Sequence, residues 1–286
     1  MGTTVKFKIN KNESKTLDDG TTVYRIYAAK TFCTENLLWV KKGARGGWVE
    51  SGTNLDQDGK CWVYGNACVY GRGRVRENAV VYGEAEVCGN ACVSGSARVC
   101  EHGAVCDGAE VYECACVFGE AVVCGAAKVY GVAIVRSGAT VGEEAEVCGE
   151  AIVTDSARVG HKAKVNNCAT ISDEARVSGS AEVRGDAAVY GRATVCGNAK
   201  IYDDATVYGD ATVRGNAEVC DSASVYGIAK VEGNATVCGD AAVYEYAEIY
   251  GDATVKGKTA VFGTARVGGN TTLNGGLFRN GDVENT

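Results

Sequence analysis

The chain has 286 residues, with 39 Gly, 15 Cys, no Pro and a net charge of −7. No apolar stretch approaches the ~18 residues of a transmembrane helix, so we expect no membrane partner. Residues 1–60 hold ten Lys and Arg against seven Asp and Glu, which leaves 19 against 29 in residues 61–286. This larger acidic part is unsuited to binding nucleic acid through a basic groove.

The cysteines bear on the compartment. Their number is odd, and they are scattered through the chain rather than paired in a short secreted frame. This usage is typical of a reducing environment, where thiols stay free. We therefore expect a cytoplasmic protein.

Residues 1–60 differ from everything that follows. Apolar residues alternate with lysines at 5–9, which predicts a strand with one wet face. Turn formers at 18–20 precede a second strand-like run at 22–29, so we expect a hairpin. An apolar cluster follows at 37–40. Because the end of a solenoid exposes unpaired strand edges, we interpret residues 1–60 as a small N-terminal β cap.

A six-residue repeat fills the rest of the chain. From Val63 to Leu273 every sixth residue is a branched aliphatic, and 32 of these 36 positions are Val. A small residue, usually Ala, follows four positions later, and a turn former, usually Gly, follows two positions later. A fixed period decides the architecture before any local pattern does. One unit is a short strand plus a corner, with the aliphatic and the Ala inside and a left-handed residue at the corner.

Outward residues indicate how many units make one coil. Charges alternate in sign at steps of 18 in one row, and aromatic rings recur at steps of 18 in another. Residues one coil apart lie about 4.8 Å apart in parallel strands, where opposite charges and stacked rings attract. We therefore predict 18 residues per coil and about 12 triangular coils in residues 61–275, followed by a C-terminal tail at 276–286. The charge row, a candidate ladder between coils, comprises Glu110, Lys128, Glu146, Lys164, Glu182, Lys200 and Glu218.

The repeat resembles the left-handed parallel β-helix of hexapeptide-repeat proteins. The stretch Gly46-Gly47-Trp48-Val49, then Gly59-Lys60-Cys61-Trp62-Val63-Tyr64, is similar to the entry into the solenoid of the YdcK-type β-solenoid family. Together these features cover residues 46 to about 275. The resemblance implies an all-β fold with left-handed coils, whereas ordinary parallel crossovers are right-handed. It implies no activity, because a fold does not define a function.

Catalysis is poorly supported by the sequence. Acyltransferases of similar fold use a His general base beside a groove, and this chain has only His102 and His161. Both fall at corners, and no inserted loop is available to build a substrate pocket. We therefore expect no catalytic residue. An acyltransferase-like enzyme is the alternative, and it would need a CoA-sized groove between subunits beside one of these histidines.

The histidines and the stacked cysteines are the candidate residues for metal or redox chemistry. Two His cannot supply the three His ligands of a solenoid carbonic anhydrase. Cys88, Cys106 and Cys124 stack at steps of 18, and so do Cys220 and Cys238. Stacking at about 4.8 Å exceeds the ~3.8 Å between the Cβ atoms of a disulfide, and it sets thiols side by side rather than around a tetrahedral centre. We expect no cofactor and no metal, with redox or metal use of the stacked thiols left open.

The three outer faces differ in charge. The face that contains Tyr190 has two charged residues among its 24 outward strand positions, against eight and eleven on the other two. Five coils of it present on the order of 400 Å², near the largest apolar patch of a typical monomer. Such a face suits a protein interface, although stacked rings also stabilise strands without any partner. The candidate interface residues are Tyr64, Tyr82, Phe118, Ile134, Ile152, Tyr190, Tyr208, Tyr226, Tyr244 and Phe262.

We therefore predict a non-enzymatic β-solenoid scaffold or protein-interaction protein. It would self-associate or dock a protein partner through this Tyr-rich face, and we expect a homo-oligomer. A bacterial cytoplasm and a phage-encoded assembly fit the residues equally. A second alternative is an acidic decoy that copies the charge of nucleic acid, which the self-neutralising charge row disfavours.

Overall fold

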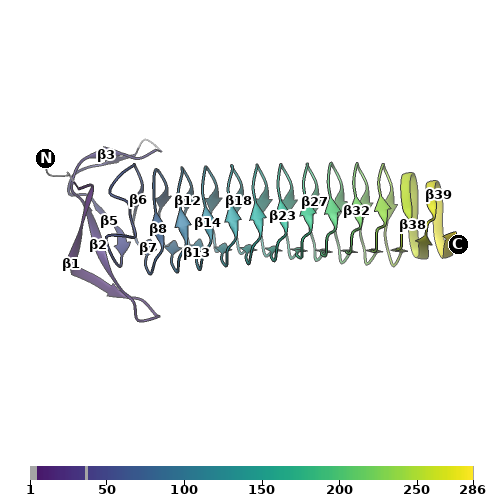
Figure 1. Ribbon diagram of the computed structural model, residues 1–286, viewed down its shortest axis with the longest axis horizontal. Helices are drawn as coiled ribbons and strands as arrows, with labels where there is room; N and C mark the ends of the chain where they lie inside the picture. The colour runs from purple at the N-terminus through teal and green to yellow at the C-terminus, as the bar shows by residue number, and fades with distance from the viewer. Residues whose placement is uncertain (1–4, 36–37, 286) are drawn as a thin grey trace. The chain divides into compact units, whose positions relative to one another are not determined.

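The computed structural model describes residues 5–35 and 38–285, so Leu37 of the predicted apolar cluster lies outside the described residues. The chain divides into two compact units, unit 1 (Met1–Glu143) and unit 2 (Glu144–Thr286). Both are built from short strands joined by tight corners (Figure 1). None of the described residues belongs to a helix with the length and apolarity to span a bilayer. The prediction of an all-β fold is confirmed.

A small sheet lies at the beginning of unit 1. β1 (Phe7–Thr16) pairs antiparallel with β2 (Thr22–Ala28), and β2 pairs antiparallel with β5 (Arg45–Val49). β3 (Phe32–Cys33) and β4 (Trp39–Val40) form a separate two-stranded sheet. The hairpin predicted from the turn residues is therefore present, and Gly20 in that turn has a φ of 87°.

Parallel coil pairing starts within the first sixty residues. Val49 of β5 pairs with Val69, Leu55 bridges to Val75, and Val63 pairs with Val81. The first two partners are therefore 20 residues apart, whereas the third are 18 apart. The eight-residue step from Leu55 to Val63 is absorbed at the corner between them, so the register downstream is unaffected.

Within each unit, a strand pairs in parallel with the strand three places further along the chain, which places three strands in each coil. The predicted period of 18 residues is thereby confirmed. The two-residue strands of unit 1 are β6 (Trp62–Val63), β7 (Cys68–Val69), β8 (Arg74–Val75), β9 (Val80–Val81), β10 (Glu86–Val87), β11 (Cys92–Val93), β12 (Arg98–Val99), β13 (Ala104–Val105), β14 (Glu110–Val111), β15 (Cys116–Val117), β16 (Val122–Val123), β17 (Lys128–Val129), β18 (Ile134–Val135) and β19 (Thr140–Val141).

Unit 2 repeats this pattern to its end. Its last two strands pair along their lengths, from Thr254↔Thr272 to Gly269↔Asn285, so coil pairing extends past Leu273. The strands of unit 2 are β20 (Glu146–Val147), β21 (Ile152–Val153), β22 (Arg158–Val159), β23 (Lys164–Val165), β24 (Thr170–Ile171), β25 (Arg176–Val177), β26 (Glu182–Val183), β27 (Ala188–Val189), β28 (Thr194–Val195), β29 (Lys200–Ile201), β30 (Thr206–Val207), β31 (Thr212–Val213), β32 (Glu218–Val219), β33 (Ser224–Val225), β34 (Lys230–Val231), β35 (Thr236–Val237), β36 (Ala242–Val243), β37 (Glu248–Ile249), β38 (Thr254–Gly269) and β39 (Thr272–Asn285).

The core consists of the inward aliphatic and small residues of the repeat. The inward Val and Ile side chains are at most 2 % exposed, and Leu273 at the end of the run is 8 % exposed. Each fully buried Val contributes about 1.5–3 kcal/mol relative to an exposed one. The core therefore requires an aliphatic at every sixth position, which is the pattern the sequence displays.

The corners place their turn residues in the left-handed region, mostly with Gly but at 13 positions with another residue. Several of these are acids whose carboxylate accepts the backbone N–H of a Gly 18 residues later. The distance is 3.0 Å for Glu101 to Gly119 and 3.1 Å for Asp107 to Gly125. This hydrogen bond offsets part of the ~1–2 kcal/mol that a left-handed backbone costs a residue with a Cβ.

Candidate protein-binding face

Five aromatic rings of unit 2 form one continuous stack, which we call the tyrosine ladder. Adjacent ring centroids lie 4.8–5.0 Å apart, and adjacent ring planes differ by 3°. Each ring directly follows an inward Val. The four tyrosines come after the Val that ends β27, β30, β33 or β36, and the phenylalanine lies within β38. The tyrosine ladder comprises Tyr190, Tyr208, Tyr226, Tyr244 and Phe262.

Strand pairing produces this stack directly. Ala188 pairs with Thr206, Thr206 with Ser224 and Ser224 with Ala242, so equivalent side chains face the same way at the strand spacing. The Thr206 and Ser224 hydroxyls share a hydrogen bond of 2.9 Å beside the rings. All five rings are half-buried, and each of the three inner rings has a stacked ring on both faces. Burial raises the pKa of Tyr190 and of Tyr226, so these phenols are neutral at physiological pH.

Two exposed apolar side chains extend the ladder around a corner. Ile228 and Tyr246 are 46 % and 63 % exposed, and they follow Tyr226 and Tyr244 by two residues. They lie 18 residues apart, one coil from each other. Sequence reasoning missed them because it counted only the residues that flank each inward aliphatic. An apolar residue at a corner, where Asn, Asp and Glu are usual, was the available signal.

Beyond Phe262 the apolar surface continues into β39. Leu277 pairs with Ala260 and is 77 % exposed. The other predicted residue of unit 2, Ile152, lies on β21 and pairs with Thr170. Thr170 and Ser172 come between Ile152 and the first ring of the ladder, so the structure separates Ile152 from the stack by a polar coil.

Three of the predicted residues of unit 1, Tyr64, Tyr82 and Phe118, line hollows instead of stacking as a ladder. Tyr64 packs edge-on against Trp62, with ring centroids 6.5 Å apart. A hollow of about 380 Å³ is lined by Leu38, Tyr64, Val80 and Tyr82, all apolar or aromatic. A hydrogen bond with Cys100, together with burial, raises the pKa of Tyr82 to about 12.

Arg98 interrupts the row of rings in unit 1. Its Nε and Nη2 donate to the Sγ of Cys116 at 3.3 and 3.1 Å. It also lines a hollow of about 230 Å³ together with Tyr82 and Phe118. Ile134 lies on the next strand, paired with Cys116. A charged side chain therefore lies among the predicted interface residues of unit 1, whereas the rings of unit 2 are contiguous.

The predicted charge ladder contains ion pairs in both units. Lys128 lies 3.9 Å from Glu110 in unit 1. In unit 2, the closest oxygen of Glu146 is 3.4 Å from the Lys164 ammonium, and that of Glu218 is 2.9 Å from Lys200. The hydrogen bond from Lys200 lowers the pKa of Glu218. Glu182 differs, because its ion pair of 3.5 Å is with Arg184 on the same strand segment.

Sequence reasoning missed one further stack and one further set of charges. Tyr112 and Tyr130 stack at 4.9 Å on the face that carries the charge ladder, so stacked rings are not restricted to the uncharged face. Glu248 lies between Lys230 and Arg266, at 3.0 Å from each. Both sets follow the spacing of 18, which was the signal that could have found them.

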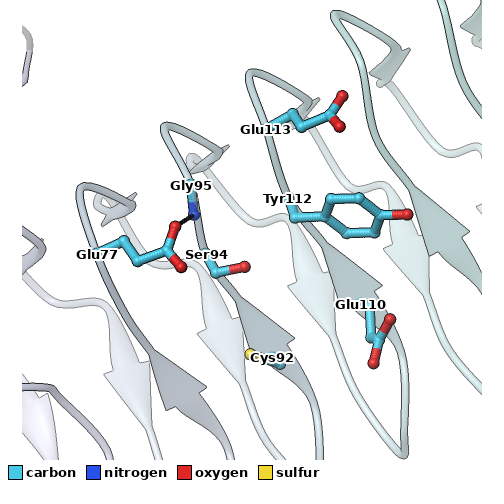
Figure 2. Close-up of a pocket in the computed structure, with 7 residues that line it drawn as sticks. All are labelled: Glu77, Cys92, Ser94, Gly95, Glu110, Tyr112 and Glu113. Atoms are coloured by element: carbon cyan, nitrogen blue, oxygen red, sulfur yellow. Dashed lines mark hydrogen bonds between the residues drawn. The ribbon is translucent and has the colours of Figure 1, made fainter.

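Unit 1 has a hollow of about 350 Å³ beside Tyr112. Figure 2 shows the residues that line it. Three of its lining residues are acids, and each carboxylate already has a partner. Glu77 accepts the Gly95 N–H at 2.8 Å, Glu113 accepts the Gly131 N–H at 2.8 Å, and Glu110 pairs with Lys128. These carboxylates therefore hold adjacent coils together.

The two histidines lie at corners, as the repeat requires. His102 is 64 % exposed in its side chain, and its Nδ1 lies 3.6 Å from the Glu84 carboxylate. His161 adopts a left-handed backbone with a φ of 56°. A turn role accounts for both positions.

No curated protein matches the chain. A family model described as the YdcK Beta solenoid repeat matches residues 199–215. The matched residues contain β29, β30 and β31, and they include Tyr208 of the tyrosine ladder. The chain therefore carries the YdcK beta solenoid repeat at residues 199–215 and is a β-solenoid.

Proposed function

We propose that this protein is a non-enzymatic scaffold that self-associates through the tyrosine ladder, with a second copy of the chain as the occupant of that face. The observation that carries the proposal is the unbroken stack of five rings, flanked by small neutral residues and extended by Ile228 and Tyr246. The 15 free thiols support a reducing, cytoplasmic setting.

The repeat of the ladder favours a second copy over an unrelated partner. The rings of the ladder are spaced 4.8–5.0 Å apart, so a partner surface contacts all of them equally only if its own side chains have the same spacing. A second copy provides such a surface. Side chains from two facing sheets then interdigitate at a sheet separation of about 10 Å.

Charge also favours this face. The chain carries a net charge of −7, so two copies repel each other wherever their acidic surfaces meet. The side chains of the ladder and the small residues beside it are uncharged. Association through the ladder keeps the acids of both copies at the rim, where water and salt screen them.

The area of the tyrosine ladder determines how tightly we expect two copies to associate. Five rings cover on the order of 400 Å², whereas a standard interface buries about 800 Å² on each partner. Ile228, Tyr246 and Leu277 add to the ladder at its edges. We therefore expect reversible, concentration-dependent association rather than an obligate dimer.

The test is sedimentation over a wide range of concentrations under reducing conditions. We expect the mass of the wild-type chain to rise with concentration. Tyr208→Glu combined with Tyr226→Glu should return it to the monomer mass at every concentration. The matched control is Ser178→Glu with Cys196→Glu, which adds the same charge at equivalent positions, one coil apart, on another face; it should associate like the wild type.

Two results would overturn self-association through this face. One is a wild-type chain that stays monomeric at the highest concentration. The other is equal loss of association in the ladder variant and in the control, which would show that added charge alone disrupts assembly. Circular dichroism of both variants establishes that the coils are intact.

A further inference from the structure

Two stacked cysteines and one corner carboxylate come together in unit 2. Cys220 follows β32 and Cys238 follows β35, and these strands pair in register. Asp221 occupies the corner after Cys220, with a left-handed φ of 56°. The two Sγ atoms and one oxygen of Asp221 all lie within 4.8 Å of one another. Cys220 is buried, Cys238 is half-buried and Asp221 is exposed.

This spacing suits a single metal ion. Three atoms within 4.8 Å of one another are all within about 2.8 Å of one common point, the limiting case being an equilateral triangle. Bonds from Zn²⁺ to sulfur are about 2.3 Å and to a carboxylate about 2.0–2.2 Å. Shifts of about 0.5 Å for each sulfur and about 0.6–0.8 Å for the oxygen, within reach of side-chain rotation, bring all three atoms to bonding distance.

We propose that Cys220, Cys238 and Asp221 bind a thiophilic divalent cation, with Zn²⁺ as the cellular candidate. Two sulfur ligands favour Zn²⁺ over Mg²⁺ or Ca²⁺, which prefer oxygen. Three protein ligands leave a fourth position for water, on the side where Asp221 meets solvent. The two stacked thiols alone lie side by side, and the corner carboxylate of Asp221 supplies a ligand from a third direction.

The carboxylate is already oriented by the backbone. Its Oδ2 accepts the N–H of Gly239 at 2.8 Å, which restricts its rotation and leaves its other oxygen free to bind. Such a hydrogen bond to a ligating group reduces the ordering that a metal must impose. The coil therefore prepares one ligand before any ion arrives.

Binding must release protons. Burial raises the pKa of Cys220 to about 11 and also raises the pKa of Cys238, so both are thiols at neutral pH. One ion then breaks two S–H bonds, forms two metal–sulfur bonds and releases two protons to solvent. After burial, the negative charge of Asp221 also raises the pKa of both thiols, whereas Lys256 lowers that of Cys238.

Unit 1 contains the same residue types at the same spacing and provides an internal comparison. Cys106 and Asp107 are followed one coil later by Cys124, and Asp107 accepts the Gly125 N–H at 3.1 Å. Of the residues that the structure describes, only the unit 2 trio brings its three ligand atoms within 4.8 Å. Cys124→Ser is therefore the closest available control, because it removes a stacked thiol from the same context.

The experiment titrates the reduced, metal-free protein with Zn²⁺ against a chromophoric chelator, and with Co²⁺ for its sulfur-to-metal absorption. We expect one tight equivalent in the wild type. Cys238→Ser should lose it together with the sulfur-to-metal band. Asp221→Asn should weaken it at least tenfold while keeping the fold, because Asn167 occupies the same left-handed corner in this chain.

The control Cys124→Ser should retain the tight equivalent, and so should Cys196→Ser. Retention of the equivalent by Cys238→Ser would overturn the proposal. So would an equal loss in Cys124→Ser, because any stacked pair of thiols would then suffice. X-ray absorption of the zinc-loaded wild type should show two sulfur neighbours at about 2.3 Å.

Discussion

Asp173 and Gly191 occupy equivalent corners one coil apart, and the Asp173 carboxylate accepts the Gly191 N–H at 2.8 Å. Both residues are left-handed, with φ values of 57° and 70°. The side chain thereby gains a hydrogen bond at a position where its backbone is disfavoured. This relationship explains why acids can replace Gly at the corners.

Asp173→Ala should lower the free energy of unfolding by about 1–2 kcal/mol. Ala has the same Cβ but no acceptor, so the left-handed cost is no longer offset and the Gly191 N–H loses its partner. Asp173→Asn should be nearly neutral, because the amide oxygen can accept the same bond. Urea unfolding measures both. The exposed neighbour Glu174→Ala is the control and should change stability by less than about 0.5 kcal/mol.

Gly47→Ala should destabilise the entry to the first coil. A Cβ on Gly47 would lie 2.4 Å from Val63 Cγ1 and 2.7 Å from the Ala67 carbonyl oxygen. Overpacking of this kind typically costs about 1–3 kcal/mol. Gly52→Ala is the matched control, because a Cβ there meets nothing within 4 Å. Equal thermal unfolding of the two variants would contradict the packing that we describe for this entry.

Tyr226→Ala should cost about 1–3 kcal/mol, because it removes two stacked ring contacts of about 0.5–1.5 kcal/mol each. Tyr226→Phe should leave stability unchanged. Phe262 stacks on Tyr244 with the same 3° between planes as the tyrosine pairs, so the hydroxyl is not needed for stacking. Thermal unfolding distinguishes the two variants, and a costly Phe substitution would show that the hydroxyl matters.

Glu248→Gln should reveal a pH-dependent ion pair. The Lys230 hydrogen bond lowers the pKa of Glu248 in the folded chain. A carboxylate with a lowered pKa stabilises the fold fully above its unfolded pKa of about 4.3, and this stabilisation disappears as pH falls through the folded value. The variant should therefore be less stable than the wild type at neutral pH, by under about 1 kcal/mol. The difference should vanish in acid.

Concentrated salt should also reduce the difference in stability between Glu248→Gln and the wild type. Salt screens the ion pairs of Glu248 with Lys230 and Arg266, because these side chains are partly exposed. Glu144→Gln is the control, since Glu144 and Lys162 are 3.7 Å apart and both side chains are mostly exposed. Its stability should match the wild type at every pH. A Glu248→Gln difference that persisted in acid would point to packing rather than charge.

The coil could be predicted because its outward residues report on their neighbours. Glu146 and Lys164 attract only if they are adjacent, so alternating charge at steps of 18 encodes the pairing found in unit 2. The inward positions also indicate the coil, because the buried position of a two-residue strand accepts few side chains besides Val and Ile. The family model matches only residues 199–215, so the repeat itself carried the prediction further than the resemblance.

The contacts that individual side chains make were harder to predict than the rows of residues that recur at steps of 18. Sequence placed Tyr64, Tyr82 and Tyr190 on one face, yet a ring in the next coil does not guarantee stacking. Tyr82 follows Tyr64 by one coil, but Tyr64 packs edge-on against Trp62. The coil after Tyr82 presents Cys100 and Arg98 instead of a ring, so hollows form there. The sequence placed Cys220 beside Cys238 but did not add the carboxylate of Asp221, because a repeat position does not show that a corner side chain reaches toward the following coil.

The longer step between Leu55 and Val63 shows where this chain accepts a change in length. Two additional residues fit at that corner, and Leu55 and Val63 still pair with Val75 and Val81. A one-residue insertion within a strand would instead turn the residues that follow it in that strand to the opposite face. The corners are therefore the natural sites for engineered peptide grafts, and duplication of a complete coil is the natural way for such a sequence to grow.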